Sequence, residues 1–174
     1  MPIYHRLGDL PPKRHTQFRK PDGGLYHEQV FGTVGFEGTS SLLYHLQPPT
    51  QVEAVGPPQD ISPKIAVENN LTMRKLLGFS IKPMDDFLDS RVPLLVNKDV
   101  TLGVAAPRHS LTDYFYKNAG ADELLFIHKG SGKLRTAFGS IPFEYGDYLV
   151  IPRGMIYQIE FDTDNNRLLY LETH

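Results

Sequence analysis

The 174-residue sequence contains no cysteine. Disulfide bonds, a thiolate nucleophile and a zinc–thiolate site are therefore excluded, and any bound metal would need nitrogen or oxygen ligands. The sequence also lacks an apolar run of about 18 residues, as a membrane-spanning helix would need, and it lacks the apolar core of a signal peptide. These absences predict a cytoplasmic protein with no membrane partner.

A strong excess of charge of one sign is likewise absent. Lys and Arg together number 18 and Asp and Glu number 20, which gives a formal net charge of −2. Such a chain has no overall field that would attract nucleic acid or an anionic membrane. The apolar fraction of 40% and the charged fraction of 22% are typical of a globular protein, and the length predicts a single domain.

Stretches long enough for a helix are scarce, because 14 prolines and 15 glycines interrupt the sequence at short intervals. We expect residues 1–40 to form an irregular N-terminal arm, basic at its start, and residues 41–174 to form the β-domain. The arm either straps across a partner subunit or lies solvated on its own domain. One short helix is predicted over Asn70–Leu77, with Gly78 as its C-terminal cap.

The C-terminal part of the sequence shows short apolar segments at the spacing of about 8–12 residues that is typical of a β-sandwich or barrel. Turn-forming residues separate these segments, as in residues 129–132 and 162–166. Earlier apolar segments at 41–46 and 92–96 also have the character of strands. The predicted C-terminal strands span residues 99–105, 113–117, 123–128, 133–138, 148–151, 157–161 and 167–172. The pattern predicts an all-β fold.

One segment of this region combines two turns and a buried strand. Gly146 begins the first turn, an apolar strand follows, and Pro152 and Gly154 reverse the chain toward Tyr157. This spacing resembles the second sequence motif of the cupins, in which a histidine stands at the position of Tyr157. The resemblance implies an RmlC-like double-stranded β-helix, a jelly-roll barrel of the cupin type with an irregular N-terminal arm.

An upstream segment resembles the second half of the first cupin motif. Glu123 is followed seven residues later by Gly130, the distance at which a glutamate precedes a glycine turn in that motif. Metal-binding cupins also carry a His-x-His pair shortly before the glutamate, whereas residues 116–119 of this chain are Tyr, Lys, Asn and Ala. Three of the four expected ligands are missing, and Fe(II) and Mn(II) generally take three or more protein ligands.

We therefore expect a metal-free barrel, with no catalytic, cofactor-binding or metal-binding residue in this chain. Glu123 is expected to be a hydrogen-bonded carboxylate inside or near the barrel mouth, and Tyr157 a packed aromatic residue with a satisfied hydroxyl. Strand alternation places Leu125 and Ile127 on the face of Glu123 and directs His128 away from it. His45 and His109 stand at no spacing that would pair them as metal ligands.

The sequence over residues 14–172 resembles the N-terminal portion of the homogentisate 1,2-dioxygenases. The segments that carry the resemblance are residues 14–21, which are close to a bacterial branch of the family, Leu25-Tyr26-His27-Glu28-Gln29, Ser41-Leu42-Leu43-Tyr44-His45, and residues 115–161. The family uses Fe(II) and dioxygen to open the ring of homogentisate, which gives maleylacetoacetate in tyrosine and phenylalanine breakdown. The resemblance places its iron ligands and its acid/base histidine in a second, C-terminal barrel, so that none of them falls on this chain.

The resemblance implies that this chain is inactive by itself and contributes to structure and assembly. Its expected partners are the missing C-terminal cupin half and further copies in a homo-oligomer. A different class of function remains open, a metal-free cupin that binds or senses a small molecule, such as a small aromatic ligand, near Glu123 and Tyr157. A self-contained metal enzyme is disfavoured because the ligand set is absent.

Overall fold

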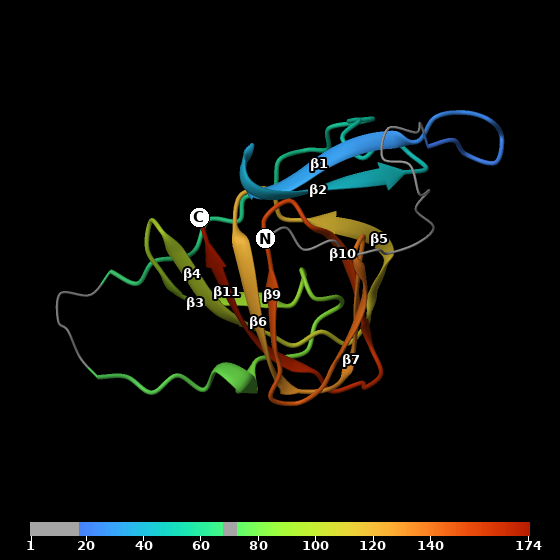
Figure 1. Cartoon of the computed structure of the whole chain (residues 1–174). Coiled ribbons are helices and arrows are strands. Elements are labelled where there is room, and N and C mark those ends of the chain that lie inside the picture. Colours follow the sequence, from blue (N-terminus) through green and yellow to red (C-terminus); the bar gives the residue numbers. More distant parts are fainter. Residues whose placement is uncertain (1–17, 68–72) are drawn as a thin grey trace. The chain divides into compact units, whose positions relative to one another are not determined.

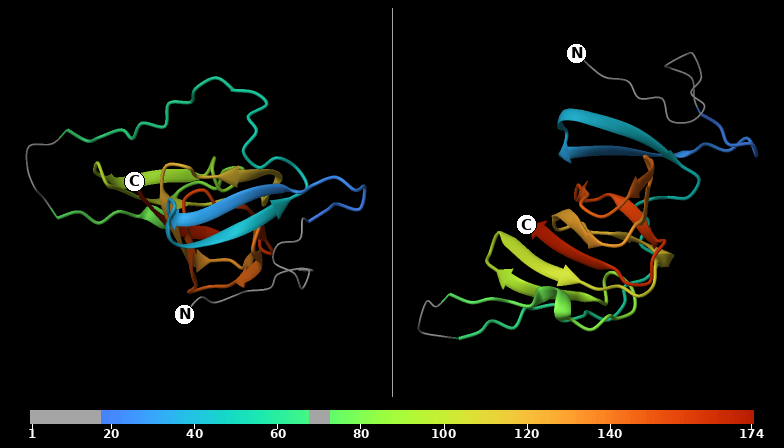
Figure 2. Two further views of the ribbon diagram at one scale, coloured as in Figure 1. Left: turned by 45° about the horizontal axis from the view of Figure 1, so that its top comes forward. Right: turned by 90° about the horizontal axis from the view of Figure 1, so that it is seen from below.

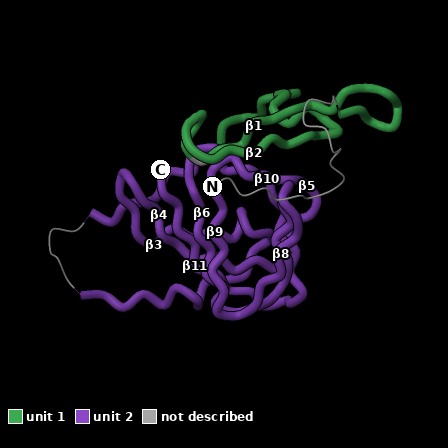
Figure 3. Tube along the Cα trace, in the orientation of Figure 1, with its two compact units in different colours: residues 1–60 green, residues 61–174 purple. Residues whose placement is uncertain are grey.

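The computed structural model describes residues 18–67 and 73–174, and the chain divides into two compact units, residues 1–60 and residues 61–174 (Figure 3). The first unit contains a β-hairpin and the second contains the β-sheets that carry the cupin-like motifs (Figure 1). The described residues include no α-helix, and their only helical element is a short 3₁₀ turn. The prediction of an all-β fold is therefore confirmed.

The hairpin of the first unit consists of β1 (His27–Val34) and β2 (Glu37–His45), which pair in antiparallel register from His27 opposite His45. The expectation that residues 1–40 are irregular is thus wrong from residue 27 onward, because antiparallel pairing with β2 stabilises a strand there that local composition does not reveal. The strand expected at 41–46 belongs to this hairpin and not to the sheets of the second unit. Residues 1–17 of the expected arm lie outside the described residues.

The second unit contains nine strands in two antiparallel sheets (Figures 1 and 2). One sheet has the order β3-β4-β11-β6-β9 and the other has the order β5-β10-β7-β8. The strands are β3 (Arg91–Val96), β4 (Val100–Ala105), β5 (Leu111–Lys117), β6 (Asp122–Lys129), β7 (Gly132–Thr136), β8 (Gly139–Phe143), β9 (Tyr148–Ile151), β10 (Ile156–Phe161) and β11 (Arg167–Thr173). Most neighbours within a sheet are not consecutive in sequence, and this order of crossings gives the jelly roll of the cupin type.

The core of the second unit lies between its two sheets. Alternate residues of β6 are buried, so that Leu125 and Ile127 face inward, and they share one apolar cluster with Leu134 and Ile159 of the opposite sheet. Strands of this kind can pack only face to face, because each sheet must remove its apolar side from water. The alternation predicted for this strand is confirmed.

Two local predictions differ from the structure. The helix expected over Asn70–Leu77 is not formed in its described part, residues 73–77, and helical geometry occurs only in the 3₁₀ turn η1 (Gly78–Ser80); residues 70–72 lie outside the described residues. The isolated apolar segment offers too few hydrogen bonds to offset the cost of nucleating a helix. The strand expected to end at 138 instead ends at Thr136, and after a turn at residues 137–138 a further strand, β8, begins at Gly139, whose φ is 123°.

Gly130 of the first cupin-like motif is required for two separate reasons. Its φ is 115°, a conformation that residues with a side chain rarely adopt, and an added Cβ would collide with the amide oxygen of Asn166. Asn166 is itself fully buried and bonded to the backbone carbonyl of Pro107 at 3.3 Å. The turn from β6 to β7 therefore depends on the absence of a side chain here.

We predict that Gly130→Ala lowers the free energy of unfolding by roughly 2–3 kcal/mol, because backbone strain and the collision with Asn166 add to each other. Chemical denaturation followed by circular dichroism measures this difference. The matched control is Gly120→Ala, since its nearest neighbour is the Asn118 side chain at 3.8 Å. Equal stability of the two variants would contradict the assignment.

Candidate functional site

The second cupin-like motif carries the chain from one sheet to the other. Gly146 and Gly154, with φ values of 95° and 81°, flank β9 on its two sides. Strand β9 pairs with β6, so that Ile151 lies opposite Glu123, and β10 then begins in the other sheet and places Tyr157 opposite Tyr116. The turns at both ends of β9 thus determine where the Glu123 and Tyr157 side chains lie.

Glu123 and Tyr157 meet inside the second unit, although they lie 34 residues apart. The Tyr157 hydroxyl donates a hydrogen bond to Glu123 Oε2 at 3.0 Å, and the two residues are 0% and 2% exposed, respectively. The ring of Tyr116 packs edge-on against that of Tyr157, with 5.5 Å between the centroids. A buried carboxylate has lost its hydration and needs hydrogen-bond donors in its place, and Tyr157 supplies one of them.

Arg91 at the start of β3 supplies the positive charge. Its Nη2 forms an ion pair with Glu123 Oε1, and its Nη1 donates to Glu172 Oε1 at 2.8 Å. The guanidinium lies over the ring of Phe87, 4.4 Å from the centroid, and 5.0 Å from that of Tyr170. One cation therefore joins two carboxylates within an aromatic surround, which favours arginine over the more strongly hydrated ammonium of lysine.

The sequence analysis missed Arg91. The residue precedes an apolar segment by one position, which is a common place for a solvated charge, and no motif marks it. The only available signal was indirect: a glutamate on the inward face of a predicted strand requires a partner. Strand pairing across β3, β4, β11 and β6 decides which of the 18 basic residues that partner is.

Burial and charge set the protonation states in this network. Burial lowers the pKa of Arg91, but the neighbouring charge of Glu123, with Tyr157 and Glu172, outweighs it and holds that pKa above its usual value. Burial and the charge of Glu123 raise the pKa of Tyr157 well above its usual value. Burial also raises the pKa of Tyr170 to about 12, although Arg91 opposes the shift. Arginine is thus charged and both tyrosines are neutral at physiological pH.

The network does not fit an Fe(II) site. Both oxygens of Glu123 already accept from donors, Arg91 and Tyr157, and a guanidinium beside the carboxylate repels a divalent cation. In the part of the chain that the structure describes, no three Asp, Glu or His side chains converge as metal ligands would. The chemistry of this donor set is that of a structural ion pair.

The histidines are distributed over separate places. His128 is exposed at the end of β6 and stacks on Phe79 with 3.9 Å between ring centroids. His109 Nδ1 lies 2.6 Å from Asp85 Oδ1 in a loop of the second unit, and His45 bonds to Gln29 within the hairpin of the first unit. Each of these histidines thus has its own partner, and neither His128 nor His109 contacts Glu123.

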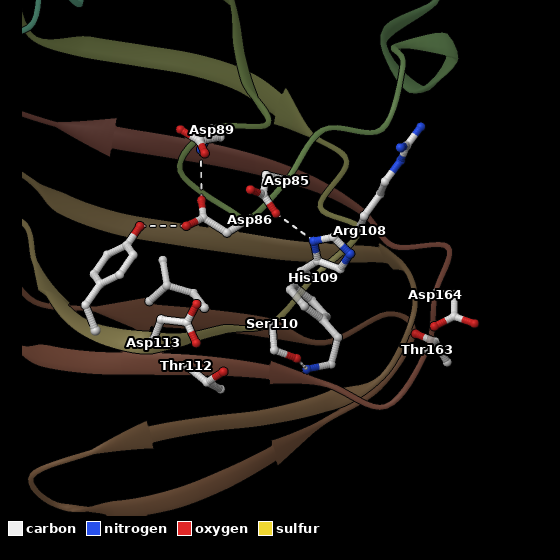
Figure 4. A pocket seen from close by; sticks show the side chains of 13 residues that line it. Asp85, Asp86, Asp89, Arg108, His109, Ser110, Thr112, Asp113, Thr163 and Asp164 are labelled. Carbon is white, nitrogen blue, oxygen red and sulfur yellow. Dashed lines mark hydrogen bonds and ion pairs between the residues drawn. The ribbon is translucent and has the colours of Figure 1, made fainter.

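A groove of about 640 Å³ opens elsewhere on the second unit (Figure 4). Its lining comes from the loop before β3, from the start of β5 and from the turn after β10, and it includes five aspartates, at positions 85, 86, 89, 113 and 164. The Tyr114 hydroxyl donates to Asp86 Oδ2 at 2.6 Å on one side of this groove. Glu123 and Tyr157 do not line this groove, and their side chains contact each other and Arg91 instead.

The described helical element is far too short to cross a bilayer, and no helix in this part of the chain has the length and apolarity for a membrane span.

The fold and the motif positions together define a cupin-type domain in which the motif residues Glu123 and Tyr157 form a buried network with Arg91. The chain belongs to the family of homogentisate 1,2-dioxygenase N-terminal domains, because the sequence model of that family matches residues 5–174. The resemblance inferred from the sequence is thereby confirmed at the level of the family.

Individual relatives agree with this assignment. A protein of Saccharolobus solfataricus, named as a candidate dioxygenase, is 38% identical over 161 residues, which is 92% of this chain and 42% of the relative. Homogentisate 1,2-dioxygenases of Legionella pneumophila and Pseudomonas entomophila are 28% and 27% identical over 88% and 96% of this chain, and over 38% and 41% of their own lengths. The chain thus spans about two fifths of the length of these curated relatives.

Solved structures show weaker similarity. A cupin-2 domain protein from Shewanella frigidimarina matches 49% of this chain and 80% of its own with a TM-score of 0.43 and 15% identity. The cupin domain of Cnp3 from Schizosaccharomyces pombe matches 48% of this chain and 62% of its own with a TM-score of 0.44 and 15% identity.

We predict that Arg91→Met lowers the free energy of unfolding by roughly 3–5 kcal/mol, because it leaves the Glu123 carboxylate buried without a counter-charge. Equilibrium denaturation measures the loss, and the double variant Arg91→Met/Glu123→Gln should recover part of it. The matched control is Arg153→Met, which breaks a half-exposed pair with Asp122 and should cost at most about 1 kcal/mol. Equal losses in the two single variants would contradict a buried network.

The raised pKa of Tyr157 makes stability depend on alkaline pH. A group whose pKa is higher in the folded state contributes stability fully below its unfolded pKa, here near 10.0, and that stability is lost as the pH rises through the folded pKa. We expect the free energy of unfolding to decline above pH 10. Tyr157→Phe should reduce the slope by about 1.4 kcal/mol per pH unit, the value for one proton.

Denaturation series between about pH 8 and pH 11.5 give this slope for each variant. Tyr145→Phe serves as the control, since Tyr145 is 71% exposed and its removal should leave the slope unchanged. The same slope in the Tyr157→Phe variant and in the unmodified chain would exclude a buried neutral phenol at this position.

Proposed function

We propose that this chain is the metal-free, structural cupin unit of a ring-cleaving enzyme of the homogentisate 1,2-dioxygenase type. The iron and the residues that open the ring are supplied outside it, by the C-terminal portion that the longer relatives carry. The reaction of the whole enzyme is the opening of homogentisate to maleylacetoacetate in the cytoplasm, as part of tyrosine and phenylalanine breakdown. The family membership and the relatives named as dioxygenases support this proposal.

The observation that carries the proposal is the pairing of Arg91 with Glu123. A non-haem iron centre needs several ligands with free lone pairs and open positions for substrate and oxygen. Of the residue types that bind metal in cupins, only a glutamate, Glu123, is present at the motif positions of this chain. Both of its carboxylate oxygens accept hydrogen bonds, one from Arg91 and one from Tyr157. The permanent charge of the guanidinium supplies at this place what a metal ion supplies in other cupins, neutralisation of a buried carboxylate, without Lewis acidity or an exchangeable position.

Within such an enzyme the chain's own residues act on structure. The ion pair connects β3 with β6 and β11 across the five-stranded sheet, and Tyr157 connects that sheet with β10 of the other. A domain whose two sheets are joined in this way provides surfaces for assembly with the C-terminal portion and with other copies, and sheet strands hold a neighbouring active site more accurately than loops do.

The groove on the second unit favours a second candidate function, a metal-free binding module. Its volume of about 640 Å³ is within the range of small-molecule sites. The negative charge of the five aspartates that line the groove disfavours the binding of an anion such as homogentisate, although one arginine, Arg108, also lines it. The expected small aromatic ligand would therefore have to be neutral or cationic to bind there.

The proposed function predicts that the chain neither retains iron nor consumes oxygen. The purified chain is incubated with Fe(II) under anaerobic conditions and desalted, bound iron is measured per chain, and oxygen uptake is then followed with homogentisate. We expect iron far below one atom per chain and no uptake. The homogentisate 1,2-dioxygenase of Legionella pneumophila, treated in parallel, is the positive control.

The variant Glu123→Gln separates specific from adventitious iron. Traces of iron that remain unchanged in this variant are unrelated to the motif and leave the proposal standing. Stoichiometric iron that disappears with Glu123→Gln, together with turnover of homogentisate, would show that the chain is itself the catalytic unit.

A further inference from the structure

The hairpin of the first unit (Figure 1) places two histidines opposite each other, His27 at the start of β1 and His45 at the end of β2. Directly opposed residues of an antiparallel pair project from the same face, with Cβ atoms about 4.5–5.5 Å apart. Among the described residues, no other two histidines are opposed in a strand pairing. The register of the hairpin thus brings together two imidazoles that are distant in the sequence.

The two rings are close enough to influence each other. Burial lowers the pKa of His45, and the positive charge of His27 lowers it further. Imidazoles that repel each other when protonated can share one cation through their lone pairs when they are neutral. His27 is exposed and His45 is half-buried, so that an ion in solution can reach the pair.

Gln29, on the same face of β1, holds the His45 ring. Its Oε1 accepts from His45 Nε2 at 2.8 Å, and because a carboxamide oxygen can only accept, Nε2 carries the proton and Nδ1 keeps its lone pair. Metal-binding histidines commonly donate their second ring nitrogen to an oxygen in this way, which sets the tautomer and the direction of the ring. The neighbouring carboxylate does not join the pair, since Glu28 points to the other face and accepts from the hydroxyl of Tyr44.

We propose that His27 and His45 form a surface site for one divalent transition-metal ion of the copper, nickel and zinc group. Two metal–nitrogen bonds of about 2.0–2.1 Å can span the separation of opposed side chains, and water completes the coordination. Imidazole suits these ions, whereas magnesium and calcium prefer oxygen ligands. With two protein ligands the site binds more weakly than a structural zinc site, which has four.

An ion held by both histidines joins the first residue of β1 to the last residue of β2. These residues form the open end of the hairpin, and a two-stranded hairpin is only marginally stable by itself. The metal therefore stabilises strand pairing in the first unit and takes no part in the chemistry of the second. The site does not rest on the proposed function, because Fe(II) stands below nickel and copper in the order of affinity, and the failure of one leaves the other standing.

Isothermal titration calorimetry with Ni(II) tests the site on the full chain, purified without an affinity tag. We expect the tightest binding step to have a stoichiometry of one. His27→Gln and His45→Gln should each weaken that step by at least about tenfold, because losing even an outer partner of a metal ligand commonly costs that much. The double variant should bind no more weakly than either single variant, since the two imidazoles act as one site.

The matched control is His27→Gln/Glu28→His, which keeps the number of histidines and moves one imidazole to the other face of β1. It should bind Ni(II) as weakly as His27→Gln. A second control, His109→Gln, removes an exposed histidine of the second unit and should bind as the unmodified chain does. Circular dichroism of each variant without metal verifies that the strands are retained.

Hydrogen exchange followed by mass spectrometry reports on the same site without any substitution. Ni(II) should slow exchange several-fold in peptides that cover residues 27–45 and leave peptides of β6 and β11 unchanged. Equal Ni(II) binding by the unmodified chain and the two single variants overturns the proposal. So does tight binding by the variant with the histidine on the other face, or unchanged exchange in residues 27–45 at saturating Ni(II).

Discussion

The ion pair between Arg91 and Glu123 is the interaction on which the interior of the second unit depends. A carboxylate that is 2% exposed has lost its hydration, and the guanidinium and the Tyr157 hydroxyl take the place of the water. Because these groups come from β3, β6 and β10, with Glu172 of β11 as a further acceptor, the strands must reach their final pairing before the charges can be satisfied.

The same network explains how this chain can keep the turns of the cupin motifs while its interior holds an ion pair between Arg91 and Glu123. The glycines at 130, 146 and 154 are needed for positive φ angles and close packing in the turns, and those requirements are independent of any metal. The side chains at the motif positions 123 and 157 meet a different requirement, because they are buried polar groups that need hydrogen-bond partners and a counter-charge. An arginine can meet that requirement as a metal can, but it cannot activate oxygen. The family membership and the Arg91 centre together favour a structural share in a dioxygenase.

The surface of the second unit includes one area that is rich in charge and one that is apolar. The groove near Tyr114 is rich in aspartate, whereas the outward side of the five-stranded sheet carries apolar residues, such as Leu124 and Phe126 of β6. A solvated carboxylate cluster is stable without a partner, but exposed apolar residues are stabilised by being covered.

The sequence by itself determined the all-β class, the strands of the C-terminal part other than β8, the inward alternation of β6 and the family, because these follow from local spacing and from turn residues with fixed requirements. It also predicted that Glu123 is a hydrogen-bonded carboxylate and that Tyr157 is a packed aromatic residue with a satisfied hydroxyl, as the structure has them. Only the tertiary structure decided that Arg91 is the partner of Glu123 and which strands lie side by side in the two sheets of the second unit. Those features depend on the pairing of distant segments, and a free energy shared among distant residues leaves no local mark in the sequence.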